Sequence, residues 1–178
     1  PNSVVEQAED NKEITILVIP NNSGATSDSI KFHKKFAMFQ VFLGHLIFKD
    51  LDLVILEPIF PRTELNWKIY THALDRDVLE TEITKLRRLD LQLENMVDET
   101  IERFNKKGWR VNNKFLIFGF SASGMFANRF TLLHPNRVLA ASIGSPGGWP
   151  IAPIKTWKGN LLRYPIGIND IDKLIGKE

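Results

Sequence analysis

Cysteine is absent from the 178 residues of this chain. Its absence excludes a disulfide framework, a thiol nucleophile and a cysteine-ligated metal centre. It does not determine the cellular compartment. The first residue is Pro1 rather than methionine, so a cytoplasmic protein and a secreted protein that has lost a leader are both open interpretations.

A surplus of charge and a long apolar run are also missing. The chain has 23 basic and 21 acidic residues, and a net charge of +2 gives no electrostatic reason to expect nucleic acid or an anionic membrane as a partner. No apolar run reaches the roughly 18 residues that span a bilayer, so no transmembrane segment is expected. With 43% hydrophobic and 25% charged residues, the composition is typical of one globular domain. We assign this domain to residues 1–178, with its core over about 13–145.

What is present is an alternation of strands and helices. Four short apolar runs are typical of buried strands, at residues 14–19, 53–56, 115–118 and 138–143. Helical spacing of apolar residues occurs at 28–49, 77–107 and 124–133, with a break expected near Arg87 and Arg88. In the first helix we expect one stripe of large residues to pack in the core: Phe32, Phe36, Phe39, Leu43 and Leu46. The alternation predicts an α/β fold, with a mainly parallel sheet between two layers of helices.

Chemistry is indicated by residues 114–135, which read KFLIFGFSASGMFANRFTLLHP. The pattern predicts a buried strand, a sharp turn and a helix, with Ser121 at the turn. A nucleophile on such a strained turn needs small residues two positions before and after it, and Gly119 and Ser123 meet this requirement. Ser123 itself fails the same test, because a methionine stands two positions after it, and Ser142 leads into a Pro-Gly-Gly segment rather than a helix. Ser121 is therefore the candidate nucleophile.

This segment resembles the nucleophile elbow of the α/β-hydrolase superfamily, in particular that of bacterial esterase and depolymerase-like serine hydrolases. Their elbow also reads G-F-S-A-x-G before a helix that ends in L-H-P, and this chain departs in having Ser123 where most members have glycine. The resemblance implies hydrolysis of a small-molecule carboxylic ester through an acyl-enzyme on Ser121, without a metal or an organic cofactor. It also implies an oxyanion hole formed by the backbone amide of Ala122 and by one from the loop after the first strand, where Asn22 and Ser23 are the candidates. A plain surface turn is the other interpretation of that loop.

The resemblance further implies that the four strands lie in the order second, first, third, fourth, so that Asn22 and Ser23 lie beside Ser121. Superfamily members place a catalytic acid and then a histidine after two further strands. The only later histidine here is His134, about 20 Å along the helix from the turn, so it is excluded as the base. We therefore expect residues 1–178 to be the larger part of a hydrolase domain that lacks its C-terminal strands with the acid and the base. The alternative is a binding protein of the same fold that does no chemistry.

Two further residues are candidates for the substrate pocket. His72 lies near Asp75 in a segment after the second strand, where hydrogen bonds that fix a loop best explain the pair, but His72 is also placed to line the pocket. Trp149 follows the fourth strand, where superfamily members insert a lid or pocket wall, and we interpret residues 146–178 in this way. Packing in the core or on the surface is an equal alternative for this tryptophan.

Overall fold

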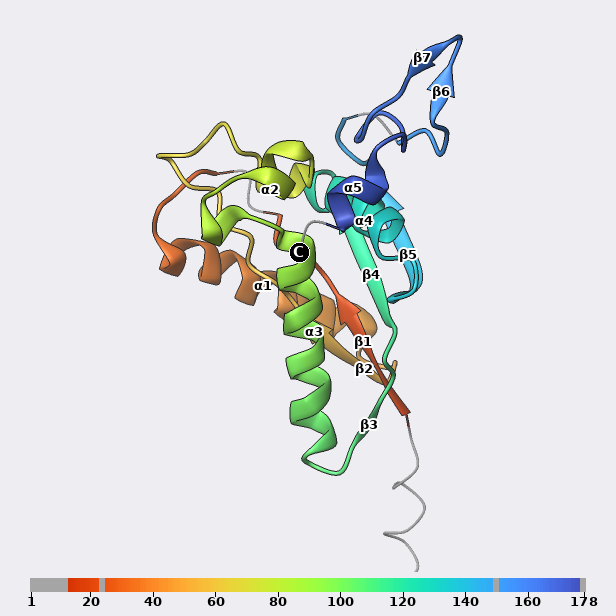
Figure 1. The fold of residues 1–178 in the computed structure, drawn as a ribbon. Helices are drawn as coiled ribbons and strands as arrows, with labels where there is room; N and C mark the ends of the chain where they lie inside the picture. The colour runs from red at the N-terminus through yellow and green to blue at the C-terminus, as the bar shows by residue number, and fades with distance from the viewer. Residues whose placement is uncertain (1–12, 23–24, 149–150, 177–178) are drawn as a thin grey trace, which may run out of the picture.

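The computed structural model describes residues 13–22, 25–148 and 151–176 (Figure 1). Its centre is a sheet of parallel strands in the order β2-β1-β4-β5, and a short strand, β3, pairs with the beginning of β1. The strands are β1 (Glu13–Val18), β2 (Leu53–Leu56), β3 (Arg110–Val111), β4 (Phe115–Phe120) and β5 (Val138–Gly144). The predicted strand order is thus confirmed, and so is the prediction of an α/β fold with a mainly parallel sheet.

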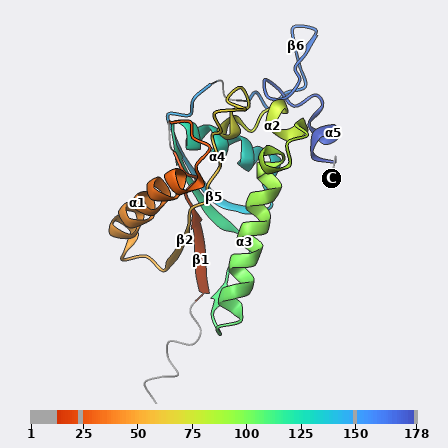
Figure 2. The ribbon, with the colours of Figure 1, turned by 90° about the vertical axis from the view of Figure 1, so that its left-hand side faces the viewer.

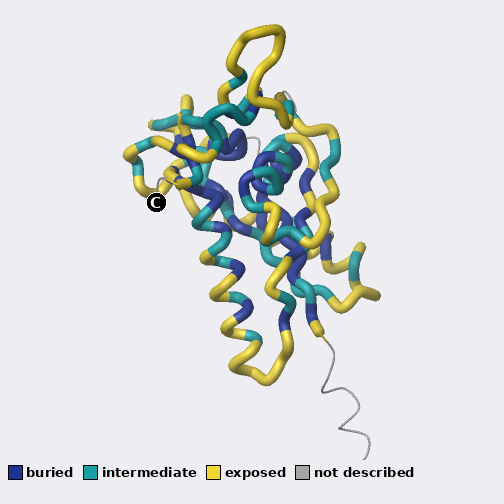
Figure 3. Tube along the Cα trace, turned by 45° about the vertical axis from the view of Figure 1, so that its right-hand side comes forward, coloured by how far each residue is buried: buried dark blue, intermediate teal, exposed yellow. Residues whose placement is uncertain are grey.

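Helices cover both faces of this sheet. Helix α1 (Ile30–Phe48) lies on one side, and α3 (Leu89–Asn105) and α4 (Ala122–Leu133) lie on the other (Figure 2). Shorter elements complete the chain: η1 (Thr71–Ala73), α2 (Arg76–Glu80), η2 (Thr84–Leu86), β6 (Thr156–Trp157), β7 (Asn160–Leu161) and α5 (Ile171–Ile175). The antiparallel hairpin of β6 and β7 is exposed and stands away from the rest of the molecule (Figures 1 and 3). None of the described helices is long and apolar enough to cross a membrane.

The main core lies between the sheet and the layer formed by α3 and α4. It is filled by buried apolar side chains from β1, β4, α3 and α4, among them Ile16, Val18, Ile117, Leu93, Val97, Phe126 and Phe130. The rings of Phe126 and Phe130 stack with their centroids 5.9 Å apart. Burial of each such side chain contributes about 1.5–3 kcal/mol. This packing fixes α4, and with it the residue that precedes the helix, Ser121.

The helical region predicted for residues 77–107 is interrupted between Glu80, the last residue of α2, and Leu89, the first of α3, so the break includes Arg87 and Arg88 as expected but begins earlier. Arg88 has a φ of 49°, a left-handed backbone conformation, and it is the N-cap of α3. Its backbone N–H donates to Val78 O at 3.0 Å, and its buried guanidinium lies 3.0 Å from the carboxylate of Asp90. The break therefore depends on contacts that Arg88 makes on both sides of it.

The prediction that the large apolar residues of α1 pack in the core is wrong. Four of them are between 39% and 59% exposed, and we call these four the outer stripe of α1: Phe36, Phe39, Leu43 and Leu46. Phe32 is half-buried, and the buried residues of the helix are His33, Ala37 and Gly44. A Cβ on Gly44 would lie 3.1 Å from Ile55 Cδ1, so the helix approaches the sheet closely through its small residues. The large side chains are therefore left on the outward side.

Strand β5 is also more exposed than its apolar sequence suggests. Residues 139–142 are exposed, including Ser142, which we expected at the small end of a buried strand. On neighbouring β4, Phe118 and Phe120 are 37% and 57% exposed. β5 is also the last strand of the described sheet, and within the described residues no element pairs with its far edge.

Candidate functional site

Ser121 stands at the junction between β4 and α4 with a strained backbone. Its φ of 57° and ψ of −116° lie outside the regions that residues other than glycine commonly occupy. Three hydrogen bonds hold this conformation: Ser121 N donates to Gly144 O at 3.0 Å, and Ser121 O accepts from Met125 N at 2.9 Å and from Gly147 N at 3.3 Å. The residue is exposed. The fold thus presents a serine on a strained turn at the carboxyl end of a central strand.

Glycines before and after the serine allow the strand and the helix to approach each other. A Cβ on Gly119 would lie 2.3 Å from Ser123 O and 2.7 Å from Gly124 N. A Cβ on Gly124 would lie 2.8 Å from Gly144 O. Real Cβ atoms do not approach backbone atoms so closely. The small residue that the sequence led us to expect two positions before Ser121 is therefore required by packing.

Ser123, the small residue two positions after Ser121, closes the turn. Its side chain is buried, and Oγ donates to Phe120 O and accepts from Phe120 N, both at 3.0 Å. These two bonds tie the first turn of α4 to the last residue of β4. The Ser123 hydroxyl is thus used within the turn, in agreement with its exclusion as a nucleophile.

The positive end of α4 lies directly after Ser121. The first backbone N–H groups of a helix have no partner within it, and together they form the positive end of the helix dipole. Ala122 is the first residue of α4, and no described residue accepts a hydrogen bond from its N–H. An anion that forms beside Ser121 would therefore meet an unpaired N–H at a helix N-terminus.

Asn22 lies in the loop that follows β1. It is brought next to Ser121, as the strand order predicted. Its side-chain Nδ2 donates to Phe120 O at 2.9 Å. Its backbone N–H donates to Gln40 Oε1, on α1, at 3.0 Å. Gln40 could not be identified from the sequence, because the contact joins residues on separate elements. Ser23 and Trp149, the other candidates from the sequence, lie outside the described residues.

His72 is a buried histidine that fixes the loop after β1. Its side chain is fully buried, Nε2 donates to Asn21 O at 2.5 Å, and Nδ1 lies 3.4 Å from Thr71 Oγ1. Burial lowers the pKa of His72 from 6.5 to about 4, so the ring is neutral at pH 7. Asp75 accepts from Val78 N as the N-cap of α2. The loop-fixing interpretation thus describes both residues, and His72 has no surface that a substrate could touch in this structure.

The stability of the protein is expected to fall between pH 6.5 and pH 4 because of His72. In this range the unfolded chain binds a proton that the folded protein, with the lowered pKa of His72, does not bind. The free energy of unfolding that the neutral His72 contributes is lost as the pH falls, and the loss amounts to about 2–3 kcal/mol between pH 6.5 and pH 4. Urea unfolding of the parent and of His72→Gln at pH 7.5 and pH 4.5 measures it, with the exposed His45→Gln as the control. Equal pH dependence in all three proteins would contradict this assignment.

None of the four histidines bonds to the Ser121 hydroxyl. Besides His72, His134 lies at the C-terminal end of α4 and its Nε2 donates to Asp90 Oδ2 at 2.9 Å. Nε2 of His33 donates to Ser27 O at 2.9 Å, and His45 is exposed on α1. Among the residues that the structure describes, no general base is therefore paired with Ser121.

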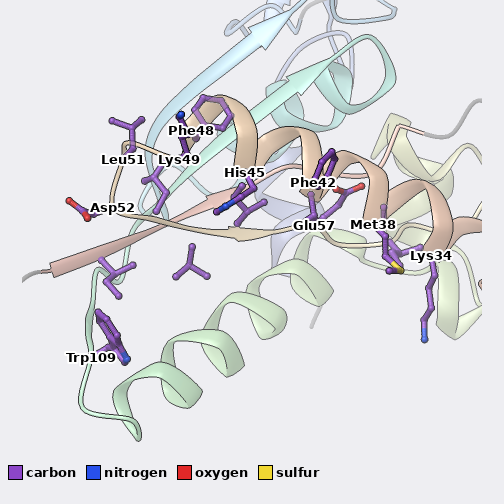
Figure 4. A pocket seen from close by; sticks show the side chains of 17 residues that line it. Lys34, Met38, Phe42, His45, Phe48, Lys49, Leu51, Asp52, Glu57 and Trp109 are labelled. Carbon is purple, nitrogen blue, oxygen red and sulfur yellow. The ribbon is translucent and has the colours of Figure 1, made fainter.

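A groove lies elsewhere, beside α1 and β2. It has a volume of about 920 Å³, with Met38, Phe42 and His45 from α1 on one side and Trp109 on the other (Figure 4). Burial raises the pKa of Glu57, at the end of β2, to about 8, and neither of its carboxyl oxygens has a hydrogen-bond partner among the described residues. Neither Ser121 nor Asn22 lines this groove, so it is separate from the strained serine.

Comparisons with known proteins add no assignment. No protein-family model matches the chain, and no curated protein or solved structure gives a significant match. Within residues 13–22, 25–148 and 151–176 there is also no group of three or more His, Asp or Glu side chains that could hold a metal ion.

Proposed function

We propose that the protein is a serine hydrolase of the α/β-hydrolase type, which hydrolyses a small-molecule carboxylic ester through an acyl-enzyme on Ser121. The observation that carries the proposal is the strained conformation of an exposed serine between a parallel strand and a helix. Strain of this kind persists only where the surrounding structure enforces it, and it is concentrated at functional sites. Here the three hydrogen bonds of the Ser121 backbone hold it, the two bonds of Ser123 close the turn, and Gly119 and Gly124 allow the close approach that it requires.

The proposed reaction has two halves. In the first, Ser121 Oγ attacks the ester carbonyl carbon and gives its proton to a base, and the alcohol leaves with a proton from that base. In the second, water attacks the acyl-enzyme, and the acid is released as Ser121 regains its proton. The negative oxygen that forms in each half is stabilised by the Ala122 N–H at the positive end of α4.

The proposal requires a base that this site does not contain among the described residues. His33, His72 and His134 are bonded elsewhere, and His45 lies on the outside of α1. The proposal therefore requires a histidine, with its acid, other than these four histidines in their observed positions. The same observation favours the second candidate, a binding protein of this fold that does no chemistry.

A fluorophosphonate probe separates the two candidates. The protein is purified as its gene encodes it, its intact mass is measured before and after reaction, and the modified peptide is sequenced. We expect one adduct, on Ser121, that is lost in Ser121→Ala and retained in Ser142→Ala, which removes an exposed serine on β5. No adduct on the full-length protein would refute the hydrolase and leave the binding protein. An adduct on an isolated 178-residue chain would show that its own residues supply the base.

A further inference from the structure

The two nitrogen atoms of Asn22 have different partners. The backbone N–H donates to Gln40 Oε1 at 3.0 Å, so this hydrogen is already used within the protein. The side-chain Nδ2 donates to Phe120 O at 2.9 Å. Because Nδ2 carries two hydrogens, one remains, and no described residue accepts it.

The orientation of the Asn22 side chain follows from its acceptor. Phe120 O is a carbonyl oxygen and cannot donate, so the atom 2.9 Å from it must be the amide nitrogen rather than Oδ1. Phe120 O belongs to the peptide bond that joins Phe120 to Ser121. The donor is therefore hydrogen-bonded to the peptide unit that immediately precedes the candidate nucleophile.

The same carbonyl oxygen places Asn22 beside the first turn of α4. Phe120 O accepts from Ser123 Oγ at 3.0 Å as well as from Asn22 Nδ2 at 2.9 Å. Both donors thus lie within hydrogen-bond distance of one atom, and the second is the side chain of the second residue of α4. The side-chain amide of Asn22 is thus anchored to the carbonyl at the junction of β4 and α4, directly before Ser121 and Ala122 in the chain.

We propose that the side-chain amide of Asn22, and not its backbone N–H, is the second donor to the oxyanion that forms at Ser121. The inference rests on the proposed hydrolase function and names the atom that completes its oxyanion hole. Nδ2 is held in place before the reaction by its bond to Phe120 O, so it can donate its second hydrogen without rearrangement. The backbone N–H could serve only after Gln40 moves away.

Substitutions of Asn22 and of Gln40 distinguish the side-chain amide of Asn22 from its backbone N–H as the oxyanion donor. Removing one oxyanion donor lowers kcat by about 10²–10³-fold with little change in KM. We expect this loss in Asn22→Ala and in Asn22→Asp, which keeps the shape of the side chain but has no N–H to donate. Gln40→Ala is expected to change kcat by less than about threefold. If the backbone N–H were the donor, Asn22→Ala would keep its rate and Gln40→Ala would raise it.

The measurement uses full-length protein, the rate of fluorophosphonate reaction at Ser121, and kcat and KM for a short-chain aryl ester. Affinity for an alkylboronic acid is the second readout, because its tetrahedral adduct on serine places an oxygen in the oxyanion position, and a merely loosened loop would not weaken it by the same factor. Urea unfolding checks that each variant folds. A reactive parent with an unaffected Asn22→Ala overturns the inference alone. An unreactive parent overturns the proposed function, and the inference with it.

Discussion

Replacing Gly119 with alanine is expected to disrupt the turn at Ser121 and to abolish its reaction with a fluorophosphonate. The added Cβ would lie 2.3 Å from Ser123 O and 2.5 Å from Ser123 C, which are backbone atoms of α4. They cannot move aside as the end of a flexible side chain can, so β4 and α4 must separate. We expect destabilisation at or above the upper end of the roughly 1–3 kcal/mol that overpacking costs. Urea unfolding and the extent of Ser121 labelling measure the two effects.

Gly147→Ala is the matched control for this change. A Cβ on Gly147 would meet only the terminal methyl of Met125, at 3.0 Å, and that side chain can change its rotamer. The N–H of Gly147, which donates to Ser121 O, is kept in the variant. We expect the control to retain labelling and to lose less than about 1 kcal/mol, within the range of tolerated core changes. If both variants unfold at the same urea concentration, the packing of the turn has been misjudged.

The second large effect is expected for Asp90→Asn. Asp90 is fully buried and accepts hydrogen bonds from Arg88 Nε and Nη2 at 3.0–3.3 Å and from His134 Nε2 at 2.9 Å. Asparagine has nearly the same shape but cannot balance the buried guanidinium of Arg88. Breaking a buried ion pair in this way costs about 3–5 kcal/mol. Because Arg88 forms the break before α3 and His134 ends α4, the loss should appear as global unfolding at lower urea.

The effect of Asp90→Asn should depend on pH in one direction. Burial alone would raise the pKa of Asp90, but the hydrogen bonds from His134 and Arg88 outweigh it and hold the pKa below the ordinary 3.8. The carboxylate therefore contributes stability that is fully present above pH 4–5 and is lost as the pH falls below about 4. We expect the difference between parent and variant to shrink on acidification over this range.

Asp98→Asn serves as the comparison for Asp90. Asp98 pairs with Arg137 at 2.5 Å in the same region, but its side chain is 55% exposed. A surface pair of this kind contributes about 0–1 kcal/mol. Equal losses in the two variants would mean that burial of Asp90 does not determine its contribution.

The strands could be predicted because they depend on local pattern, and their order was implied by the resemblance of the elbow segment. Continuous apolar runs located four of the five strands of the main sheet, and the resemblance implied that the first of these lies beside the third. The two-residue strand β3 was not predicted. The break at Arg88 was visible as an interruption of helical spacing. Ser121 was found because its neighbours must be small, a requirement that the packing around Gly119 explains.

The face of α1 that packs on the sheet and the hydrogen-bond partners of the site residues could not be predicted. Helical spacing identifies a stripe but not the side on which it packs, and Ala37 and Gly44 pack on the sheet because they are small. His72 depends on Asn21 O, 51 residues away, and no local pattern indicates such a contact. Likewise, the backbone N–H of Asn22 donates to the side chain of Gln40, which lies on another element, α1. These contacts exist only once the chain has folded.

The outer stripe of α1 is expected to make association of the protein depend on temperature and on salt, although its overall composition is ordinary. Phe36, Phe39, Leu43 and Leu46 face water on one helix, next to further exposed apolar residues such as Met38 and Ile47. Attraction between such surfaces weakens on cooling and strengthens with salts that are excluded from protein surfaces. We therefore expect the protein to stay dispersed in cold buffer without sulfate or phosphate, and to associate through this helix on warming or on addition of such salts.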